Sequence, residues 1–251
     1  MSFFGRLHTK LRALFNANGF VCDGCGKELF NYPVYRFCAD CEGKLRETPA
    51  LHCEKCGRQT TAQGLCLDCK QRTPVYTRGF APFVYIGETA GYINRMKNGG
   101  RRLALYFGER VADYFLQEHA PALGQDPLLI IPVPMTAERE KARGYNQAEE
   151  LAEAVCNRLQ SRGVSAETDE EILQKRYETA QQKHLNKKER RENIAGAYHV
   201  HKRAACKGRT VLLIDDIHTT GATGDECAER LLKAGAAQVY FLTVATLPEQ
   251  K

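Results

Sequence analysis

Cysteine is distributed very unevenly along this chain of 251 residues. Eight of its eleven cysteines lie close together, and all eight form Cys-x-x-Cys pairs, namely Cys22/Cys25, Cys38/Cys41, Cys53/Cys56 and Cys66/Cys69. Two thiolates in one tight turn can point at one metal ion, and two such pairs complete a closed tetrahedral zinc site. Because a segment of this size cannot bury a large core, metal binding would supply most of its folding free energy. The sequence therefore predicts a zinc-binding module over residues 21–72.

Two arrangements of the four pairs are open. The first and third pairs are both followed by glycine, whereas the second and fourth are both built as Cys-x-Asp-Cys. This internal duplication favours sequential pairing, with one ion on the first two pairs and a second ion on the last two. Cross-braced pairing is the alternative. Two alternatives to metal binding are weaker. A disulfide framework would suit a small secreted protein, and a redox-active cysteine pair would explain only one of the four motifs.

The first twenty residues predict a short amphipathic helix rather than a secretory signal. The apolar positions recur at helical spacing. They are interrupted by the basic side chains Arg6, His8, Lys10 and Arg12, so there is no continuous apolar stretch of the kind a secretory signal has. Binding to a membrane surface is an alternative for this helix. No window approaches 18 apolar residues, so no transmembrane segment is expected and a cytoplasmic location is predicted. The net charge of +6 permits anionic partners.

Strands alternate with helices from about residue 78 onward, after a linker at 70–74. The apolar runs at 128–133 and 210–214 are typical of buried parallel strands. Further strands are expected at 80–86, 171–174, 197–201 and 238–245. Helices are expected at 89–97, 103–116, 147–159 and 221–234. This alternation predicts an α/β fold over residues 78–251, with a mainly parallel sheet and helices on both faces.

The segment after the strand at 210–214 carries the clearest indication of a ligand. Asp215 and Asp216 follow the strand, and a loop of small residues then leads into a helix: Thr219, Thr220, Gly221, Ala222 and Thr223. Small residues let backbone N–H groups approach a phosphate, and the helix N-terminus adds partial positive charge. The acids suit ribose hydroxyls or a magnesium shell. An ordinary helix cap explains the threonines but not the acids, so a ribose 5-phosphate site is predicted.

This run resembles the signature of type I phosphoribosyltransferases, which bind phosphoribosyl pyrophosphate (PRPP). The resemblance implies that Asp215 and Asp216 hold the ribose 2- and 3-hydroxyls, that the loop at 219–223 wraps the 5-phosphate, and that Mg²⁺ accompanies PRPP. His218 stands where the signature usually has an aliphatic residue. It would place a titratable side chain at the pocket rim, without a catalytic role.

Further motifs resemble the ComF family of competence-associated proteins, in which a cysteine zinc module precedes a phosphoribosyltransferase domain. They are Ile131-Pro-Val-Pro134, Arg143-Gly-Tyr-Asn-Gln-Ala148, Thr179-x-x-Gln182-x-x-Leu185 and Arg190-Arg-x-Asn193. Many members carry one four-cysteine site, whereas this chain has cysteines for two. The resemblance implies a type I phosphoribosyltransferase-like fold and a role in DNA uptake during natural transformation.

Two other segments are candidates for the pyrophosphate side of the pocket. Arg143, Gly144, Asn146 and Gln147 follow the strand at 128–133, although Asn146 could instead cap the next helix. Thr179 and Gln182 lie in a predicted flap at 176–185. The sequence does not decide whether the basic turn at 97–102 binds phosphate or is simply an exposed loop. The charged segment at 187–192 is expected to form a solvated helix.

Two functions remain open at this point. An enzyme would bind Mg-PRPP and transfer its ribose 5-phosphate to a nitrogen base, with Asp215, Asp216 and Arg143 as candidate catalytic residues. The alternative is a DNA-binding zinc protein that uses the phosphoribosyltransferase fold for ligand binding or regulation. Its zinc module would contact single-stranded DNA or a DNA-uptake protein, with Tyr32, Tyr35 and Phe37 either stacking on bases or forming the module's core.

Overall fold

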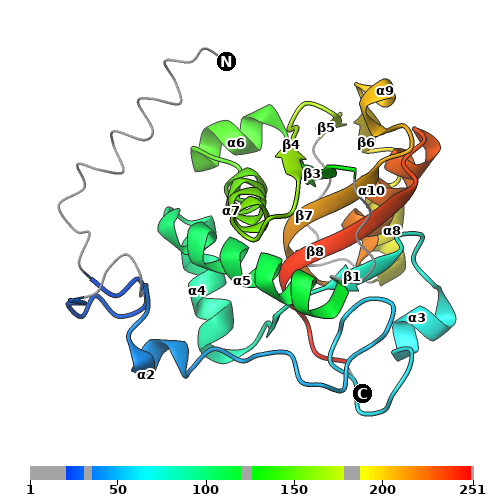
Figure 1. Ribbon diagram of the computed structural model, residues 1–251. Helices are drawn as coiled ribbons and strands as arrows, with labels where there is room; N and C mark the ends of the chain where they lie inside the picture. The colour runs from blue at the N-terminus through cyan, green and yellow to red at the C-terminus, as the bar shows by residue number, and fades with distance from the viewer. Residues whose placement is uncertain (1–20, 31–35, 120–125, 178–186, 250–251) are drawn as a thin grey trace, which may run out of the picture. The chain divides into compact units, whose positions relative to one another are not determined.

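The computed structural model describes residues 21–30, 36–119, 126–177 and 187–249 (Figure 1). The chain divides into two compact units, one up to Leu45 and one from Arg46 to the C-terminus. The division falls inside the cysteine-rich segment, so residues 21–72, which were expected to form one module, are shared between both units. The helix expected over residues 1–20 lies outside the described residues.

A parallel sheet of six strands forms the centre of the larger unit in the described part of the chain. The order is β1-β8-β7-β3-β4, and β2 also pairs with β8. The strands are β1 Arg78–Phe80, β2 Phe83–Val84, β3 Leu128–Pro132, β4 Ala166–Thr168, β7 Thr210–His218 and β8 Gln238–Thr246. The central strands β3, β7 and β8 are the apolar runs, because helices cover both of their faces.

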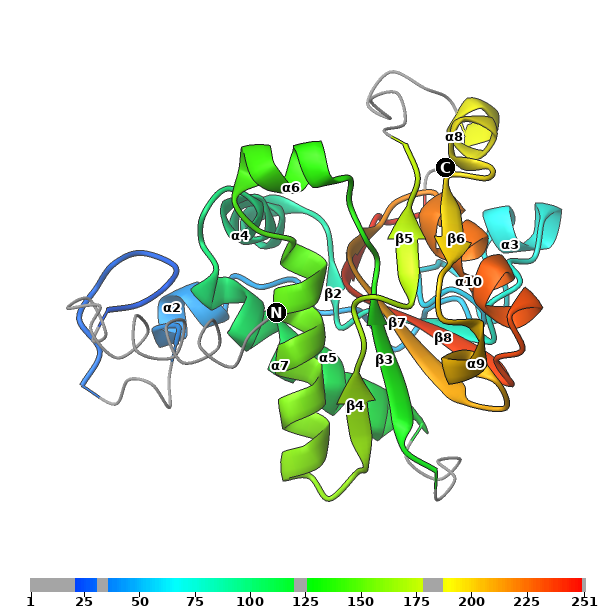
Figure 2. The same ribbon diagram turned by 90° about the horizontal axis from the view of Figure 1, so that it is seen from above.

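The described part of the larger unit has four longer helices. These are α4 Gly87–Lys97, α5 Arg102–His119, α7 Gln147–Ser161 and α10 Ala222–Lys233. Helices α5 and α7 lie on one face and α10 on the other, as Figure 2 shows. Gly108 of α5 meets α7 so closely that a Cβ there would lie 2.4 Å from the Cβ of Ala154. The predicted α/β fold with helices on both faces is therefore confirmed.

Shorter elements complete the described part of the chain. The helices are α2 Ala39–Glu42, α3 Leu67–Gln71, α6 Ala137–Arg143, α8 Lys187–Ile194 and α9 Arg203–Cys206. Strands β5 Leu173–Lys175 and β6 Tyr198–Val200 form a separate antiparallel pair. None of the helices in the described ranges is long and apolar enough to cross a membrane.

Some elements differ from the sequence-based expectation for identifiable reasons. The strand expected at 80–86 is two short strands, because Pro82 between them has no N–H for a sheet hydrogen bond. Helix α6 was not expected, because it buries none of its residues and so has no apolar period. Strand β4 has only three residues, two of them exposed. Strand β7 continues beyond Ile214 as far as His218.

Candidate functional site

Two sequence-distant segments meet at the carboxyl edge of the sheet. Strands β3 and β7 are parallel neighbours, with Pro132 opposite Ile214. The N–H of Val133 donates to the carbonyl oxygen of Ile214 at 2.8 Å. The residues that follow the two strands therefore emerge side by side, at the edge where α/β sheets bind their ligands.

The acid pair lies at the end of β7 and is held by side chains from two other segments. Asp216 is 7% exposed. Its Oδ1 lies 3.1 Å from Nζ of Lys97, and its Oδ2 accepts a hydrogen bond from Nε2 of Gln147 at 2.7 Å. Removal from water, together with the neighbouring charge of Asp216, raises the pKa of Asp215 to about 7. Asp215 Oδ1 accepts from the backbone N–H of Asp216 at 2.8 Å.

The segment after β3 supplies the residues that orient Gln147. The guanidinium of Arg143 donates to Oε1 of Gln147, which leaves the amide NH₂ to bind Asp216. Gly144 ends α6 with a φ of 88°, a left-handed conformation that favours glycine. Arg143, Gln147 and Asp216 thus form one connected group.

Asn146 acts as the cap of α7. Its Oδ1 accepts from the N–H of Ala148 at 3.0 Å, and its Nδ2 donates to the carbonyl of Val133 at 3.3 Å and to Oε1 of Glu149 at 3.0 Å. The side chain is 2% exposed. Of the two alternatives for this residue, the structure favours capping.

The basic turn between α4 and α5 reaches the acid pair. The hydroxyl of Tyr145 donates to the carbonyl of Met96 and accepts from the N–H of Gly99 at 3.4 Å. The guanidinium of Arg101 lies 5.0 Å from the Tyr145 ring centroid. Tyr145 therefore fastens the turn to the segment after β3, and Lys97 at the end of α4 contacts Asp216. The sequence alone did not decide whether this turn binds phosphate or is an exposed loop.

The loop at 219–223 begins the N-terminus of α10. Gly221 is the N-cap with a φ of 75°, and a Cβ at this position would lie 2.6 Å from Nε2 of His218. Glycine is therefore required both by the backbone and by the neighbouring ring. Thr219, Thr220 and Thr223 are partly exposed, whereas Ala222 is buried. The first turn of the helix thus offers hydroxyl and N–H donors beside the acid pair.

His218 does not lie at a pocket rim, so that expectation is wrong. The side chain is 3% exposed. Its ring packs against Tyr76 and Phe241, with centroid distances of 6.4 and 5.7 Å. Burial, together with the charge of Arg58, lowers the pKa of His218 to about 3, so the ring is neutral. Burial alternates over the last residues of β7, and this alternation carries His218 into the interior.

Thr179 and Gln182 lie outside the described residues. The described residues on either side of them are joined, because Arg176 N–H donates to the carbonyl of Ala197 at 2.8 Å. The hydroxyl of Tyr177 donates to the carbonyl of Ala195 at 3.0 Å.

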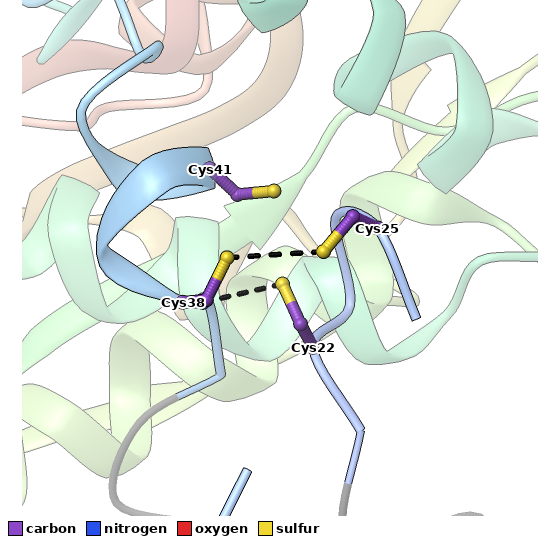
Figure 3. A group of neighbouring side chains, drawn as sticks. All are labelled: Cys22, Cys25, Cys38 and Cys41. Atoms are coloured by element: carbon purple, nitrogen blue, oxygen red, sulfur yellow. Dashed lines mark hydrogen bonds between the residues drawn. The ribbon is translucent and has the colours of Figure 1, made fainter. Parts of the chain in front are cut away.

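Four cysteines of the smaller unit form the first candidate metal centre. The sulfur atoms of Cys22, Cys25, Cys38 and Cys41 all lie within 4.8 Å of one another (Figure 3). The backbone N–H groups of Gly24 and Cys38 donate to Sγ of Cys22 at 3.3 and 3.2 Å. Burial raises the pKa of Cys22, but these and other hydrogen bonds outweigh it and lower that pKa to about 7. Phe37 beside the centre is buried, whereas Tyr32 and Tyr35 lie outside the described residues.

The second candidate metal centre belongs to the larger unit. The sulfur atoms of Cys53, Cys56, Cys66 and Cys69 lie within 4.8 Å of one another, and all four residues are buried. The Cys66 N–H donates to Sγ of Cys53 at 3.3 Å. The grouping confirms sequential pairing, and all eight cysteines are free thiols rather than disulfides.

Both groups fit a tetrahedral ion. A metal–sulfur distance of about 2.3 Å implies sulfur atoms about 3.8 Å apart. The thiols of Cys25 and Cys38 lie 3.8 Å apart, and those of Cys56 and Cys66 lie 3.6 Å apart. Each group can therefore hold one metal ion.

Known proteins match most of this chain. A family model described as the phosphoribosyl transferase domain matches residues 109–251, which is more than half of the chain. The DNA utilization protein YhgH of Escherichia coli O157:H7 is 30% identical over 80% of this chain and 86% of that protein. Competence protein ComFC of Bacillus subtilis is 26% identical over 96% of each chain. Competence protein F of Haemophilus influenzae is 29% identical over 90% of each chain.

Proposed function

Since the chain belongs to the phosphoribosyltransferase family, and within it to the ComF proteins, we propose that its larger unit binds PRPP with Mg²⁺. The observation that carries this proposal is the group around Asp216. Lys97 and Gln147 arrive there from two different segments, and the loop at 219–223 follows in the same chain. A helix cap alone would require neither contact.

The proposal assigns a role to each part of the edge. The loop at 219–223 binds the 5-phosphate through N–H groups and hydroxyls. Asp215 and Asp216 accept hydrogen bonds from the ribose hydroxyls. Arg143 and Lys97 would compensate the charge of the pyrophosphate. The paired carboxylates are oxygen ligands of the kind that Mg²⁺ prefers, and the ion would neutralise the pyrophosphate charge.

These residues suit transfer of the ribose 5-phosphate to a nitrogen acceptor. The C1–O bond to pyrophosphate breaks, a C1–N bond forms with the acceptor lone pair, and the acceptor nitrogen releases a proton to solvent. Arg143 and Lys97 would stabilise the leaving pyrophosphate, and the loop would hold the sugar in place. Release of pyrophosphate from PRPP in the presence of a nitrogen base would establish the reaction.

Calorimetric titration with Mg-PRPP tests the binding proposal. We expect the wild type to bind and the double variant Asp215→Asn/Asp216→Asn to lose most of the affinity. Glu229→Gln is the control, because this acid lies on the exposed side of α10 and pairs with Lys233. An unaltered chain that bound neither PRPP nor ribose 5-phosphate would refute the proposal.

The names of the relatives support a role in DNA uptake and use. We propose that PRPP binding accompanies the handling of single-stranded DNA, and that the two ligands use separate sites. Binding of single-stranded DNA should then weaken steeply with salt and survive the double substitution of the acid pair. Loss of DNA binding in that variant would instead indicate one shared site.

We also propose that both cysteine groups hold structural Zn²⁺, because four thiolates leave no open position for water. Eight reduced thiols suit the cytoplasm, where the chain is predicted to reside. Elemental analysis of the purified protein should then find two zinc ions per chain.

A further inference from the structure

A buried arginine joins the second cysteine group to the candidate phosphate loop. Arg58, two residues after Cys56, is 4% exposed. Its Nη2 donates to the carbonyl oxygen of Thr219, the first residue of the loop. Its Nη1 donates to Oδ2 of Asp68 at 3.1 Å, and Asp68 lies in α3 between Cys66 and Cys69. Since burying a charge is costly unless the charge is paired, this guanidinium is strongly restrained in place.

A second connection runs through His218. Its ring packs against Tyr76, which lies in the same buried core as the four cysteines of the second group. The same ring lies under Gly221, where a Cβ would come within 2.6 Å of Nε2. The core that contains the second cysteine group therefore reaches the loop at Gly221 through Tyr76 and His218.

A third connection holds the far end of the loop. Asp225, in the first turn of α10, accepts a hydrogen bond from the N–H of Val75 at 2.6 Å and from the guanidinium of Arg72 at 3.4 Å. Both donors follow Cys69 closely in the chain. The segment that carries the second cysteine group, together with the residues that follow it, thus contacts Thr219 at the start of the loop and Asp225 just after its end.

We propose that the metal ion at Cys53, Cys56, Cys66 and Cys69 holds the loop at 219–223 in its ligand-binding conformation, with Arg58 as the positioning residue. Without the ion, the two Cys-x-x-Cys turns are no longer held together, and the backbone of Arg58 is no longer fixed in position. The loop must then be ordered when the ligand binds, which lowers affinity. By linkage, a bound ligand must equally strengthen metal binding. The inference rests on the proposed PRPP site.

Arg58→Met tests whether Arg58 positions the loop, because it removes the guanidinium and keeps much of the side-chain length. We expect this variant to keep both zinc ions by elemental analysis. Amide hydrogen exchange at 219–223 should become faster without any ligand. Affinity for Mg-PRPP should fall about tenfold, the size expected for one charged hydrogen bond. Arg209→Met is the control, because Arg209 is an arginine of the same unit that donates to Glu167 and to the carbonyl of Pro127.

A measurement on the unaltered chain supplements the variant. Saturating Mg-PRPP should slow the release of one of the two zinc ions to a chromogenic chelator, and Arg58→Met should abolish this protection. If Arg58→Met proves unstable, Asp68→Asn removes the carboxylate that orients the guanidinium and should give the same results.

The outcomes separate the inference from the proposed function. Unchanged amide hydrogen exchange at 219–223 in a folded, zinc-loaded Arg58→Met variant would refute the positioning role of Arg58, whether or not PRPP binds. Faster amide exchange in a chain that did not bind PRPP would support the positioning role and refute the proposed ligand. Normal PRPP affinity in the variant would overturn the role of Arg58.

Discussion

At the scale of single residues, the candidate site contains several features that reduce the stability of the fold. The end of a strand with no ligand to bind would be expected to lack them. Asp215 keeps a carboxyl group partly removed from water beside a second acid, and its pKa rises to about 7 as a result. Gly221 brings the backbone within contact of a buried ring. Such local conflicts are characteristic of functional sites, where binding rather than stability decides the residue.

The raised pKa of Asp215 predicts a stability that depends on pH. Between about pH 4 and pH 7 the folded protein keeps a proton that the unfolded chain releases, so stability falls as pH rises. Asp215→Asn has no charge to bury. Its free energy of unfolding should exceed that of the wild type by more than about 1 kcal/mol near pH 8 and match it near pH 4. Urea unfolding at the two pH values measures the difference.

Asp113→Asn is the control for this experiment and should behave in the opposite way. Burial raises the pKa of Asp113, but hydrogen bonds and charge from Arg158 outweigh it and lower that pKa. The substitution should therefore reduce stability near pH 8. An Asp215→Asn variant that was less stable than the wild type at both pH values would contradict the prediction.

Gly221→Ala should destabilise the protein by more than strain alone. A φ of 75° is unfavourable for alanine, and the new Cβ would also lie 2.6 Å from Nε2 of His218. Gly163→Ala is matched to it, because Gly163 has a φ of 81° and nothing within 4 Å. Thermal unfolding should show a loss of about 1 kcal/mol for Gly163→Ala and a clearly larger loss for Gly221→Ala. Equal losses would mean that His218 moves aside freely.

At the scale of elements, the site depends on the turn between α4 and α5. Sequence alone left this turn undecided, because glycines and cations suit phosphate binding and exposed loops equally well. Tyr145 attaches it to the segment after β3 through Met96 and Gly99. The attachment brings the Lys97 ammonium to Asp216, so the turn belongs to the site.

Lys97→Met should weaken PRPP binding by about tenfold, because a cation near the pyrophosphate is lost. The charge of Lys97 also lowers the pKa of Asp215, so the pH dependence of binding should shift upward in the variant. Lys233→Met is the control, since Lys233 pairs with Glu229 on the exposed side of α10. Calorimetry across a pH series measures both effects. Tighter binding in Lys97→Met would show that Lys97 competes with the ligand instead.

At the scale of the whole molecule, the two cysteine groups differ in what surrounds them. The second group shares an apolar core with strands β3, β7 and β8 of the larger unit, including Leu129, Val211 and Phe241. The first group lies in the smaller unit, which ends at Leu45. The two similar halves of the cysteine-rich segment therefore form two candidate metal centres in different structural settings.

This difference predicts unequal effects of losing a thiol ligand. Cys66→Ser should lower the melting temperature of the main unfolding transition, because its centre is part of the larger unit's core. Cys25→Ser is the matched substitution in the smaller unit and should leave that transition unchanged. Each variant should retain about one zinc ion per chain. Calorimetric melting with zinc analysis tests both expectations, and equal shifts would contradict them.

Local patterns in the sequence already determined most of the longer helices and strands and their order. Apolar runs marked the buried strands, and the duplicated Cys-x-x-Cys pairs indicated which thiols share an ion. The acid pair and small-residue loop marked one ligand segment, since their chemistry is contained in consecutive residues. The three-residue strand β4 and helix α6, which buries none of its residues, carried no such pattern.

Tertiary structure alone decided which distant residues meet at that segment. Arg58 and Thr219 are 161 positions apart, and Gln147 and Asp216 are 69 apart, so no local period relates them. The burial of His218 and the assignment of the second cysteine group to the larger unit depend on the same packing. Side-chain chemistry can be read from neighbouring residues, whereas a contact across the fold exists only once the sheet brings its strands together.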